Sequence, residues 1–485
     1  MTAKQLTDSI LQLAIQGKLV PQNPDDEPAS VLLDRIREEK KRLVKEGKLK
    51  KKELEETPIS DEEIPFEIPD SWEWVRFGAI SYNRDSERIP LSVEQRSRLE
   101  KRYDYYGASG VIDKVDKYLF DKPLLLIGED GANLINRSTP IAFIARGKYW
   151  VNNHAHVLDY YNDDLMQYIC WYINAISLVD YVTGTAQPKM NQEKMNSILV
   201  ALPPIKEQKR ISERIDELLP LVKEYGKAYD EVTQLNAELP EKLKKSILQE
   251  AIMGKLGTQD PNDEPASVLL DRIREEKKQL VKDGVLKKKD LVETPIDEDE
   301  MPFAVPDNWM WIRLQDVTTY ISRGKSPVYS EIKKYPIVAQ KCNQWAGFSL
   351  EKAKFADPKT IEKYAEERQL KDGDLLWNST GLGTLGRMAI YNSSVNPYGW
   401  AAADSHVTVI RTIPDFADYK FLYYYFASPI VQSVIEDKSD GSTKQKELAQ
   451  ETVKKYEVPL PPLAEQHRIV EKIEALFAEV DHMEI

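Results

Sequence analysis

The chain has little cysteine, little histidine and no long apolar run, and each shortage excludes a class of protein. Its 485 residues include only two cysteines, Cys170 and Cys342, which predicts a reducing compartment and no disulfide framework. Five scattered histidines and the lack of a CxxC pair leave few ligands for a zinc site. No apolar stretch has the length of a membrane span, and no signal peptide opens the chain. These shortages favour a cytoplasmic protein.

Sequence motifs for catalysis are also scarce. No GxxxxGK[ST] loop occurs, which argues against ATP-driven motor chemistry. Gly381–Gly386 fits GxGxxG, but a short β-like run follows it instead of a helix, so we interpret it as a β-turn and not as a dinucleotide or S-adenosylmethionine site. Asn396-Pro397-Tyr398 lacks the second proline of an amino-methyltransferase motif and is interpreted as a surface loop. Glu129 and Asp130 lack the further carboxylates and lysine of a nuclease, so we expect turn or hydrogen-bonding roles.

An internal repeat dominates what is present. The sixteen letters DEPASVLLDRIREEKK at Asp26–Lys41 recur unchanged at Asp263–Lys278. A second block, LPPIKEQKRI at Leu202–Ile211, recurs as LPPLAEQHRI at Leu460–Ile469. Two dissimilar stretches, roughly 73–200 and 310–458, lie between these blocks. The pattern indicates two similar halves in which a constant frame surrounds divergent cores.

The divergent cores still share features that indicate one fold used twice. Leu124–Gly131 resembles Asp374–Gly381, and Gln187 aligns with Gln445. His156 aligns with His406, and because both lie among apolar residues we interpret both as structural histidines. The halves are therefore expected to share a backbone and to differ in the side chains that it carries.

Helical periodicity marks the repeated segments. Apolar residues from Ile211 to Val232 follow a heptad pattern, and an apolar stripe continues to Gly254. Pro220 and Pro240 are expected to kink this run or to divide it. The C-terminus repeats the first part of the seam and the N-terminus repeats the last part. We therefore predict a near-circular arrangement in which the terminal helices pack antiparallel against the central ones.

The expected fold class is α/β, with two α/β globular domains separated by long antiparallel coiled-coil-like helices. Short β-like runs (Leu124–Ile127, Pro140–Ile144, Ala403–Ile410) alternate with helical ones (Leu165–Val179, Asp418–Val434). The predicted segments are a helical region and linker at 1–72, a first domain at 73–200, a central helical spacer at 201–309, a second domain at 310–458 and a C-terminal helix at 459–485.

Polar and basic loops within the two cores predict binding to DNA. Arg and Lys can pair with guanine, Asn and Gln with adenine, and Ser and Lys can hold phosphates. The candidates in the first core are Arg84, Tyr105, Tyr106, Ser109, Asn152, Asn153, His154, Gln187 and Lys189, and those in the second are Arg323, Lys325, Ser326, Gln340, Lys341, Gln344, Lys444 and Gln445. The net charge of −13 argues against a free-standing DNA binder, so we expect neighbouring subunits to supply part of the phosphate attraction.

With these residues in place, the chain resembles the specificity subunit of a type I restriction–modification enzyme. The resemblance rests on YDYYGASG at Tyr103–Gly110, IGEDGAN at Ile127–Asn133, WVNNHAHVL at Trp150–Leu158, QPKMNQEKM at Gln187–Met195 and the twofold LPPxxEQxRI block. It implies a non-catalytic subunit whose two domains each recognise one half of a bipartite, asymmetric DNA site. It also implies that the helices fix the spacer and dock two methyltransferase subunits, which carry S-adenosylmethionine, and through them restriction subunits, which use ATP and Mg²⁺.

Three alternatives remain open from the sequence. A stand-alone methyltransferase or nuclease would show activity when the purified chain meets S-adenosylmethionine, or Mg²⁺ and plasmid. A protein-interaction scaffold would explain the acidic charge and the helical seams equally well. A stand-alone DNA-binding protein would bind without a methyltransferase partner.

Overall fold

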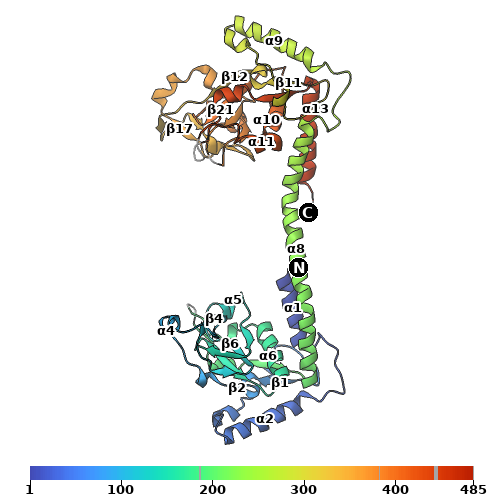
Figure 1. Ribbon diagram of the computed structural model, residues 1–485, viewed down its shortest axis with the longest axis vertical. Helices are drawn as coiled ribbons and strands as arrows, with labels where there is room; N and C mark the ends of the chain where they lie inside the picture. Colours follow the sequence, from blue (N-terminus) through green and yellow to red (C-terminus); the bar gives the residue numbers. More distant parts are fainter. Residues whose placement is uncertain (185–186, 382, 442–445, 484–485) are drawn as a thin grey trace. The chain divides into compact units, whose positions relative to one another are not determined.

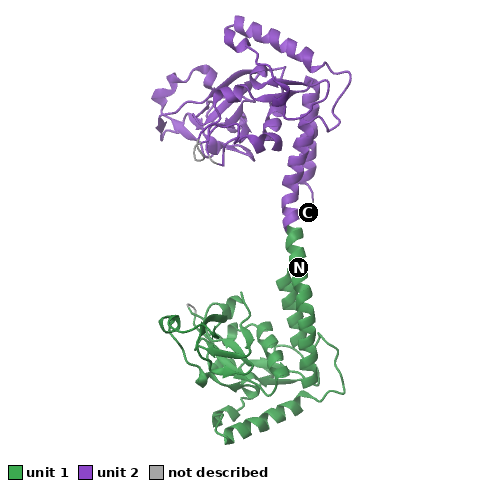
Figure 2. Cartoon of the chain, in the orientation of Figure 1, with its two compact units in different colours: residues 1–233 green, residues 234–485 purple. Residues whose placement is uncertain are grey.

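The computed structural model describes residues 1–184, 187–381, 383–441 and 446–483. The chain divides into two compact units, Met1–Thr233 and Gln234–Ile485 (Figure 2). The boundary falls inside the 48-residue helix α8 (Ile205–Ile252), so each unit contains one part of that helix. Each unit combines long helices, called the frame helices, with a domain of mixed strands and helices (Figure 1). The frame helices lie within 3–45, 205–282 and 463–481, and the mixed domains, called the recognition domains, span 73–202 in unit 1 and 310–460 in unit 2. The α/β fold class expected from the sequence is therefore confirmed.

The recognition domain of unit 1 contains two four-stranded sheets. One has the order β2-β9-β6-β7 and is antiparallel; the other has the order β4-β3-β8-β5, with β3 and β8 parallel. Its strands are β1 (Glu73–Arg76), β2 (Tyr82–Asn83), β3 (Tyr103–Gly107), β4 (Gly110–Val115), β5 (Phe120–Asp121), β6 (Leu124–Gly128), β7 (Ala142–Ala145), β8 (Lys148–Val151), β9 (Ala155–Asp159) and β10 (Leu199–Leu202). Besides its part of α8, unit 1 contains the helices α1 (Ala3–Ile15), α2 (Ala29–Lys45), α3 (Phe77–Ile80), α4 (Val93–Ser97), α5 (Asn133–Asn136), α6 (Asp163–Ala175) and α7 (Gln192–Asn196). Strands β1 and β10 pair antiparallel where the domain begins and ends.

Unit 2 repeats this plan. Its sheets have the orders β12-β21-β18-β19 and β13-β17-β14-β20, again with one parallel pair, β14 and β20. The strands are β11 (Met310–Arg313), β12 (Thr318–Arg323), β13 (Tyr329–Ser330), β14 (Pro336–Val338), β15 (Asn343–Gln344), β16 (Gly347–Phe348), β17 (Lys354–Ala356), β18 (Leu375–Asn378), β19 (Met388–Ile390), β20 (Ala402–Ala403), β21 (Val407–Thr412) and β22 (Glu457–Leu460). The helices are α9 (Ala266–Lys282), α10 (Tyr419–Ala427), α11 (Pro429–Val434), α12 (Gln450–Lys454) and α13 (Leu463–Asp481).

The central strand of each recognition domain divides two hydrophobic cores. In β6, Leu125 and Ile127 join the core that includes the frame helices, whereas Leu124 and Leu126 join a second core between the sheets. Strand β18 follows the same alternation, with Leu375 and Trp377 on the helix side and Leu376 on the other. Since successive side chains of a strand point to opposite faces, a strand buried on both faces must be apolar throughout. This explains the unbroken LLLIG and LLW runs.

The terminal helices pack antiparallel against α8, as the sequence predicts (Figure 1). In unit 1, the Tyr225 hydroxyl donates to the carbonyl of Met1 (2.7 Å), while the side chain of Gln22 donates to Glu207 (2.5 Å). In unit 2, Lys244 of α8 pairs with Asp481 at the end of α13 (2.5 Å). Each pair of helices therefore covers part of the apolar seam of α8.

Prolines act differently at two places from what we expected. Pro220 and Pro240 do not divide α8, which is one helix throughout. Each removes a single N–H donor at a cost of about 3 kcal/mol, and the surrounding Leu, Lys and Glu residues favour helix. By contrast, the helix predicted over 418–434 is split, because extended Ser428 ends α10 and Pro429 starts α11 at the helical position that proline favours.

The repeated DEPASVLLDRIREEKK segment forms α2 and α9, whose buried faces match. Ala29, Leu32, Leu33 and Ile36 are buried in α2, and their counterparts are buried in α9. Each helix also buries a lysine. Lys40 of α2 donates to the carbonyl of Gly78 (2.5 Å), and Lys277 of α9 donates to the carbonyl of Gln315 (3.0 Å). Burial lowers the pKa of Lys40 to about 8. The repeat therefore belongs to the frame and packs against the recognition domain.

A second set of buried contacts joins each domain to the start of its LPPxxEQxRI helix. In unit 1, the indole of Trp72 donates to Glu207 (3.0 Å), and Arg210 pairs with Asp26 (2.7 Å). In unit 2 the same contacts are made by Trp309 with Glu465 (2.9 Å) and by Arg468 with Asp263. We call the helices and these contacts the frame.

Candidate nucleic-acid interface

Four loops of unit 1 converge at one end of the β9-β6 strand pair. Backbone hydrogen bonds join Glu129 to the carbonyl of His154 (2.9 Å) and Gly131 to that of Pro188 (2.9 Å). The β3–β4 turn packs on the same place, where a Cβ added to Gly128 would lie 2.7 Å from the carbonyl oxygen of Ala108. Glycine is thus required at the end of β6 to let the turn approach. We call these segments, 107–110, 128–131, 152–155 and 187–190, loop cluster 1.

Loop cluster 1 contains most of the residues predicted for the first core. Ser109, Asn153, His154, Gln187 and Lys189 are exposed. Asn152 is buried, and its side-chain oxygen accepts from the backbone N–H of His154 (2.8 Å). The Nδ1 atom of His154 lies 2.7 Å from a carboxylate oxygen of Asp130. These exposed donors and acceptors on a short, hydrogen-bonded scaffold are the kind of groups that read base edges and hold phosphates.

A buried ionic network supports loop cluster 1 from below. His156 is 2% exposed, and its ring nitrogens contact Asp85 (2.6 Å) and the carbonyl of Met190 (2.9 Å). Burial opposes its charge, but the bond to Asp85 prevails and raises the pKa of His156. Burial likewise opposes ionisation of Glu129, yet bonding to Arg88 (2.8 Å) keeps the pKa of that carboxyl low. The structural role predicted for His156 is confirmed.

Three predicted residues of the first core are placed differently. Tyr105 is 1% exposed, and its hydroxyl accepts from the backbone N–H of Leu91 (2.9 Å), so its ring packs inside the domain and is not available at the surface. Tyr106 stacks on Phe143 and is half-buried. Arg84 pairs with two carboxylates, Glu87 (2.7 Å) and Asp159 (3.3 Å), away from the four loops. The tyrosines lie on strand β3, and strand alternation directs Tyr105 into the core.

An equivalent group of loops converges in unit 2. The Ser379 N–H donates to the carbonyl of His406 (2.9 Å), and the Lys325 N–H donates to that of Ala403 (3.1 Å). Ser326 and Ser405 share a hydroxyl hydrogen bond (3.1 Å). A Cβ on Gly324 would lie 2.1 Å from the carbonyl oxygen of Ala403, so only glycine allows the Arg323–Ser326 loop to reach this position. We call segments 323–326, 340–344, 378–381, 403–406 and 446–448 loop cluster 2.

The remaining candidates of the second core lie around Thr380. The Gln340 side chain donates to the hydroxyl of Thr380 (3.0 Å), and the Gln344 side chain accepts from Arg387 (2.9 Å). Arg323 is paired with Glu447, whereas Lys325 and Lys341 are exposed. Lys444 and Gln445 lie outside the described residues.

The structure corrects the alignment of the two histidines. Strand pairing sets Gly128 opposite Ala155 in unit 1 and Asn378 opposite Val407 in unit 2. The residues just before Ala155 and Val407 are therefore equivalent. These residues are His154 and His406, so His406 corresponds to His154 and not to His156. His406 is exposed, so the structural role predicted for it is wrong. Sequence alignment erred because residues 129–154 separate β6 from β9, whereas the two-residue-longer segment 379–406 separates β18 from β21, so the offset between the halves changes before the histidines.

Sequence reasoning also missed groups that act only through the fold. Thr380 and Asp130 each hold a histidine ring, and Arg387 comes from the turn after β18. Trp345 is 48% exposed at the tip of the β15–β16 hairpin, next to Gln344. A polar pair that follows a buried strand and precedes a glycine, as in IGEDG and WNSTG, is the signal that could have located Asp130 and Thr380.

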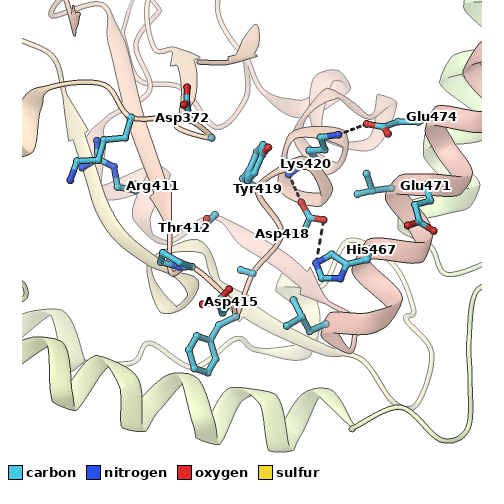
Figure 3. Close-up of a pocket in the computed structure, with 17 residues that line it drawn as sticks. Asp372, Arg411, Thr412, Asp415, Asp418, Tyr419, Lys420, His467, Glu471 and Glu474 are labelled. Atoms are coloured by element: carbon cyan, nitrogen blue, oxygen red, sulfur yellow. Dashed lines mark hydrogen bonds and ion pairs between the residues drawn. The ribbon is translucent and has the colours of Figure 1, made fainter. Parts of the chain in front are cut away.

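A cavity of about 810 Å³ lies in unit 2 between the recognition domain and α13 (Figure 3). Two side-chain contacts cross it: Lys420 pairs with Glu474 (2.8 Å), and the His467 ring lies 3.8 Å from the Asp418 carboxylate. These contacts dock the start of α10 on the frame helix. We see no nucleophile–base arrangement among these residues, and the cavity is distinct from loop cluster 2.

Cofactor sites are not evident in the part of the chain that the structure describes. Its His, Cys, Asp and Glu residues form no group of three suited to a metal ion. The Gly381–Gly386 segment is followed by strand β19, which agrees with a turn and not with a phosphate-binding loop. None of the described helices combines the length and apolar character that a bilayer crossing needs.

Comparison with known proteins decides the family. The family model of the type I restriction modification DNA specificity domain matches residues 69–234 and 306–484, the two regions that contain the loop clusters. The chain belongs to this family. It is therefore a DNA-specificity component of a type I restriction–modification enzyme and not its methylating or cleaving part.

Individual relatives agree over the whole chain. The EcoEI specificity subunit of Escherichia coli is 28% identical, and the alignment covers 99% of this chain and 90% of that protein. The EcoAI specificity subunit of Escherichia coli is 29% identical, with coverage of 98% and 89%. A solved HsdS subunit from Thermoanaerobacter tengcongensis is 17% identical, with a TM-score of 0.45 and coverage of 87% and 93%.

Proposed function

We propose that unit 1 and unit 2 each bind one half of a bipartite, asymmetric DNA site, through loop cluster 1 and loop cluster 2. The observation that carries the proposal is that equivalent positions of one sheet hold different side chains. Backbone β-bridges pair Asp130 with Lys189 in unit 1 and Thr380 with Glu447 in unit 2. Because base identity is read through donors and acceptors, two unlike clusters on one scaffold fit two unlike half-sites.

The methyltransferase partners of such a complex are proposed to dock on α8. Val232 in unit 1 and Leu235 in unit 2 are 55% and 60% exposed, although they continue the apolar seam. An apolar stripe at helical spacing is suited to a partner helix. The net charge of −13 also supports a partner that contributes positive charge near DNA. We propose two methyltransferase subunits, with restriction subunits bound through them.

The division of chemistry in this complex follows the resemblance. The chain itself is proposed to bind no cofactor, S-adenosylmethionine belonging to the methyltransferase subunits and ATP with Mg²⁺ to the restriction subunits. The cytoplasm is the proposed location, and the free, buried thiols of Cys170 and Cys342 support it.

Lengthening α8 tests the proposal. Four residues inserted between Val232 and Leu235 add one turn, about 6 Å of helix, which corresponds to at most about two base pairs. Sequencing of methylated sites in cells is expected to show unchanged half-sites and a spacer longer by one or two base pairs. A four-residue insertion at exposed Gly47 is the control and leaves the spacer unchanged. Altered half-sites with an unchanged spacer would contradict the proposal.

A protein-interaction scaffold without a DNA role is the second candidate, because the same exposed stripe of α8 supports it. The two candidates differ in DNA binding. Sequence-selective binding by the complex with its methyltransferase partner, weakening steeply with salt, would exclude the scaffold.

A further inference from the structure

His154 and His406 occupy equivalent positions in the two recognition domains. Each immediately precedes the strand that pairs with the central strand of its sheet, β9 or β21. The backbone carbonyl of each accepts from the residue just after that central strand, Glu129 or Ser379, over 2.9 Å in both units. The equivalence therefore rests on hydrogen-bond register, independently of the sequence alignment.

Each histidine makes one backbone and one ring hydrogen bond, at equivalent positions in the two units. The backbone N–H of each histidine donates to a buried side chain two residues earlier, Asn152 or Asp404, over 2.8 Å. The Nδ1 atom contacts the second residue after the central strand, Asp130 (2.7 Å) or Thr380 (2.8 Å). No described residue bonds Nε2 of either ring, and both side chains are exposed, that of His154 to 50%. An exposed ring that is fixed at Nδ1 and has Nε2 unbonded among the described residues is pre-organised for a ligand.

The neighbours of each ring are groups that suit DNA. Lys189 and Asn153 are exposed in loop cluster 1, and Lys325 and Ser326 are exposed in loop cluster 2. Lysine and serine can hold the phosphate backbone and so leave the fixed ring to face a base edge.

Resting on the proposed function, we propose that His154 and His406 are base-reading residues, each of which contacts one base pair of its own half-site through Nε2. The two anchors give the rings opposite polarity. The Asp130 carboxylate only accepts, so Nδ1 of His154 is the nitrogen that carries the hydrogen, and we assign Nε2 as an acceptor, which suits the amino group of adenine or cytosine. The Thr380 hydroxyl, unlike a carboxylate, can donate to Nδ1 of His406; we assign it this role, which leaves Nε2–H as a donor that suits guanine, thymine or adenine N7.

The test uses the full chain assembled with its methyltransferase subunits. Half-sites are first read from the methylated sites of the wild-type system, and affinity is then measured for DNA carrying each single base-pair change. His154→Ala is expected to lower affinity for the cognate DNA about tenfold and to remove discrimination at one base pair of one half-site. His406→Ala is expected to do the same in the other half-site only. His482→Ala, at the end of α13, is the control histidine and changes neither.

Anchor variants test the polarity without removing the ring. Thr380→Asp is expected to shift the preference at the His406 base pair from an acceptor towards an amino group, while the other half-site stays unchanged. A loss that is uniform over all sequences, with a shallower salt dependence, would show a phosphate contact and overturn the inference. An unchanged preference in both alanine variants would also overturn it. A wild-type complex without any sequence preference would instead overturn the proposed function itself.

Discussion

Buried Glu207 of α8 is expected to hold the recognition domain of unit 1 on that helix. We expect it to act as a hydrogen-bond acceptor and not through its charge. It is 1% exposed and accepts from the indole of Trp72 (3.0 Å) and from Gln22 (2.5 Å). Glu207→Ala leaves the buried indole N–H without a partner, whereas exposed Gln22 can bind water. An unpaired buried donor costs about 1–3 kcal/mol, and the lost bond from Gln22 adds to this. We expect the variant to destabilise unit 1 by about 2–3 kcal/mol.

Glu207→Gln separates the contribution of the hydrogen-bond acceptor from that of the charge. The amide oxygen still accepts from Trp72, and the buried charge is gone. Burial raises the pKa of Glu207, so the folded chain holds this proton more tightly than the unfolded chain. The contribution of the carboxyl is thus most favourable at low pH and is lost as pH rises through its folded pKa. We expect Glu207→Gln to lie within about 1 kcal/mol of the wild type at pH 7 and to lack this pH dependence.

Hydrogen exchange on the full chain, followed by mass spectrometry, measures both effects locally. A loss of 2–3 kcal/mol corresponds to about 30- to 150-fold faster exchange in peptides from α1 and the start of α8. The equivalent variant Glu465→Ala should speed exchange in unit 2 only, because Trp309 and Thr258 are its donors. Equal acceleration by Glu207→Gln and Glu207→Ala would refute the reasoning, since the charge would then matter more than the acceptor.

Three further changes test individual side chains. Burial lowers the pKa of Lys40 to about 8, so the free energy of unfolding should rise with pH from about 8 to about 10.4. Lys40→Met should remove this rise. In denaturant melts at neutral pH the variant should be more stable by about 1–2 kcal/mol. The raised pKa of His156 means that its bond to Asp85 stabilises unit 1 at low pH and is lost as pH rises through that pKa; exchange rates in β9 should show this loss, and His156→Gln should abolish it. Trp345→Ala should lower affinity for DNA by up to about tenfold through the unit 2 half-site only, in competition binding with each half-site altered in turn.

Sequence periodicity predicted what depends on spacing along one element. The seam from Ile211 to Val232 predicted the antiparallel packing of the terminal helices, and the apolar run Leu124–Ile127 predicted a strand, which the structure shows to be buried on both faces. Features that depend on the partner of an element were not predictable. Tyr105 is polar enough for an interface, yet its place on β3 puts its ring in the core. Pro220 looked disruptive, yet it lies on the exposed side of a long helix that tolerates it.

The contrast between frame and loop clusters has a physical origin. Glu207 and Glu465 are buried and make matching bonds, so a change at either would leave a buried donor unpaired. Exposed positions such as Lys189 and Lys325 can change at little cost to folding, usually within about 0.5 kcal/mol. Two halves that fold alike but recognise different DNA must therefore agree where side chains are buried and can differ where they face the ligand. The histidines His154 and His406 combine the two demands: each ring is exposed, and the bonds that fix it are provided by different residues at equivalent positions, which is how one scaffold can present the same ring with opposite hydrogen-bonding polarity.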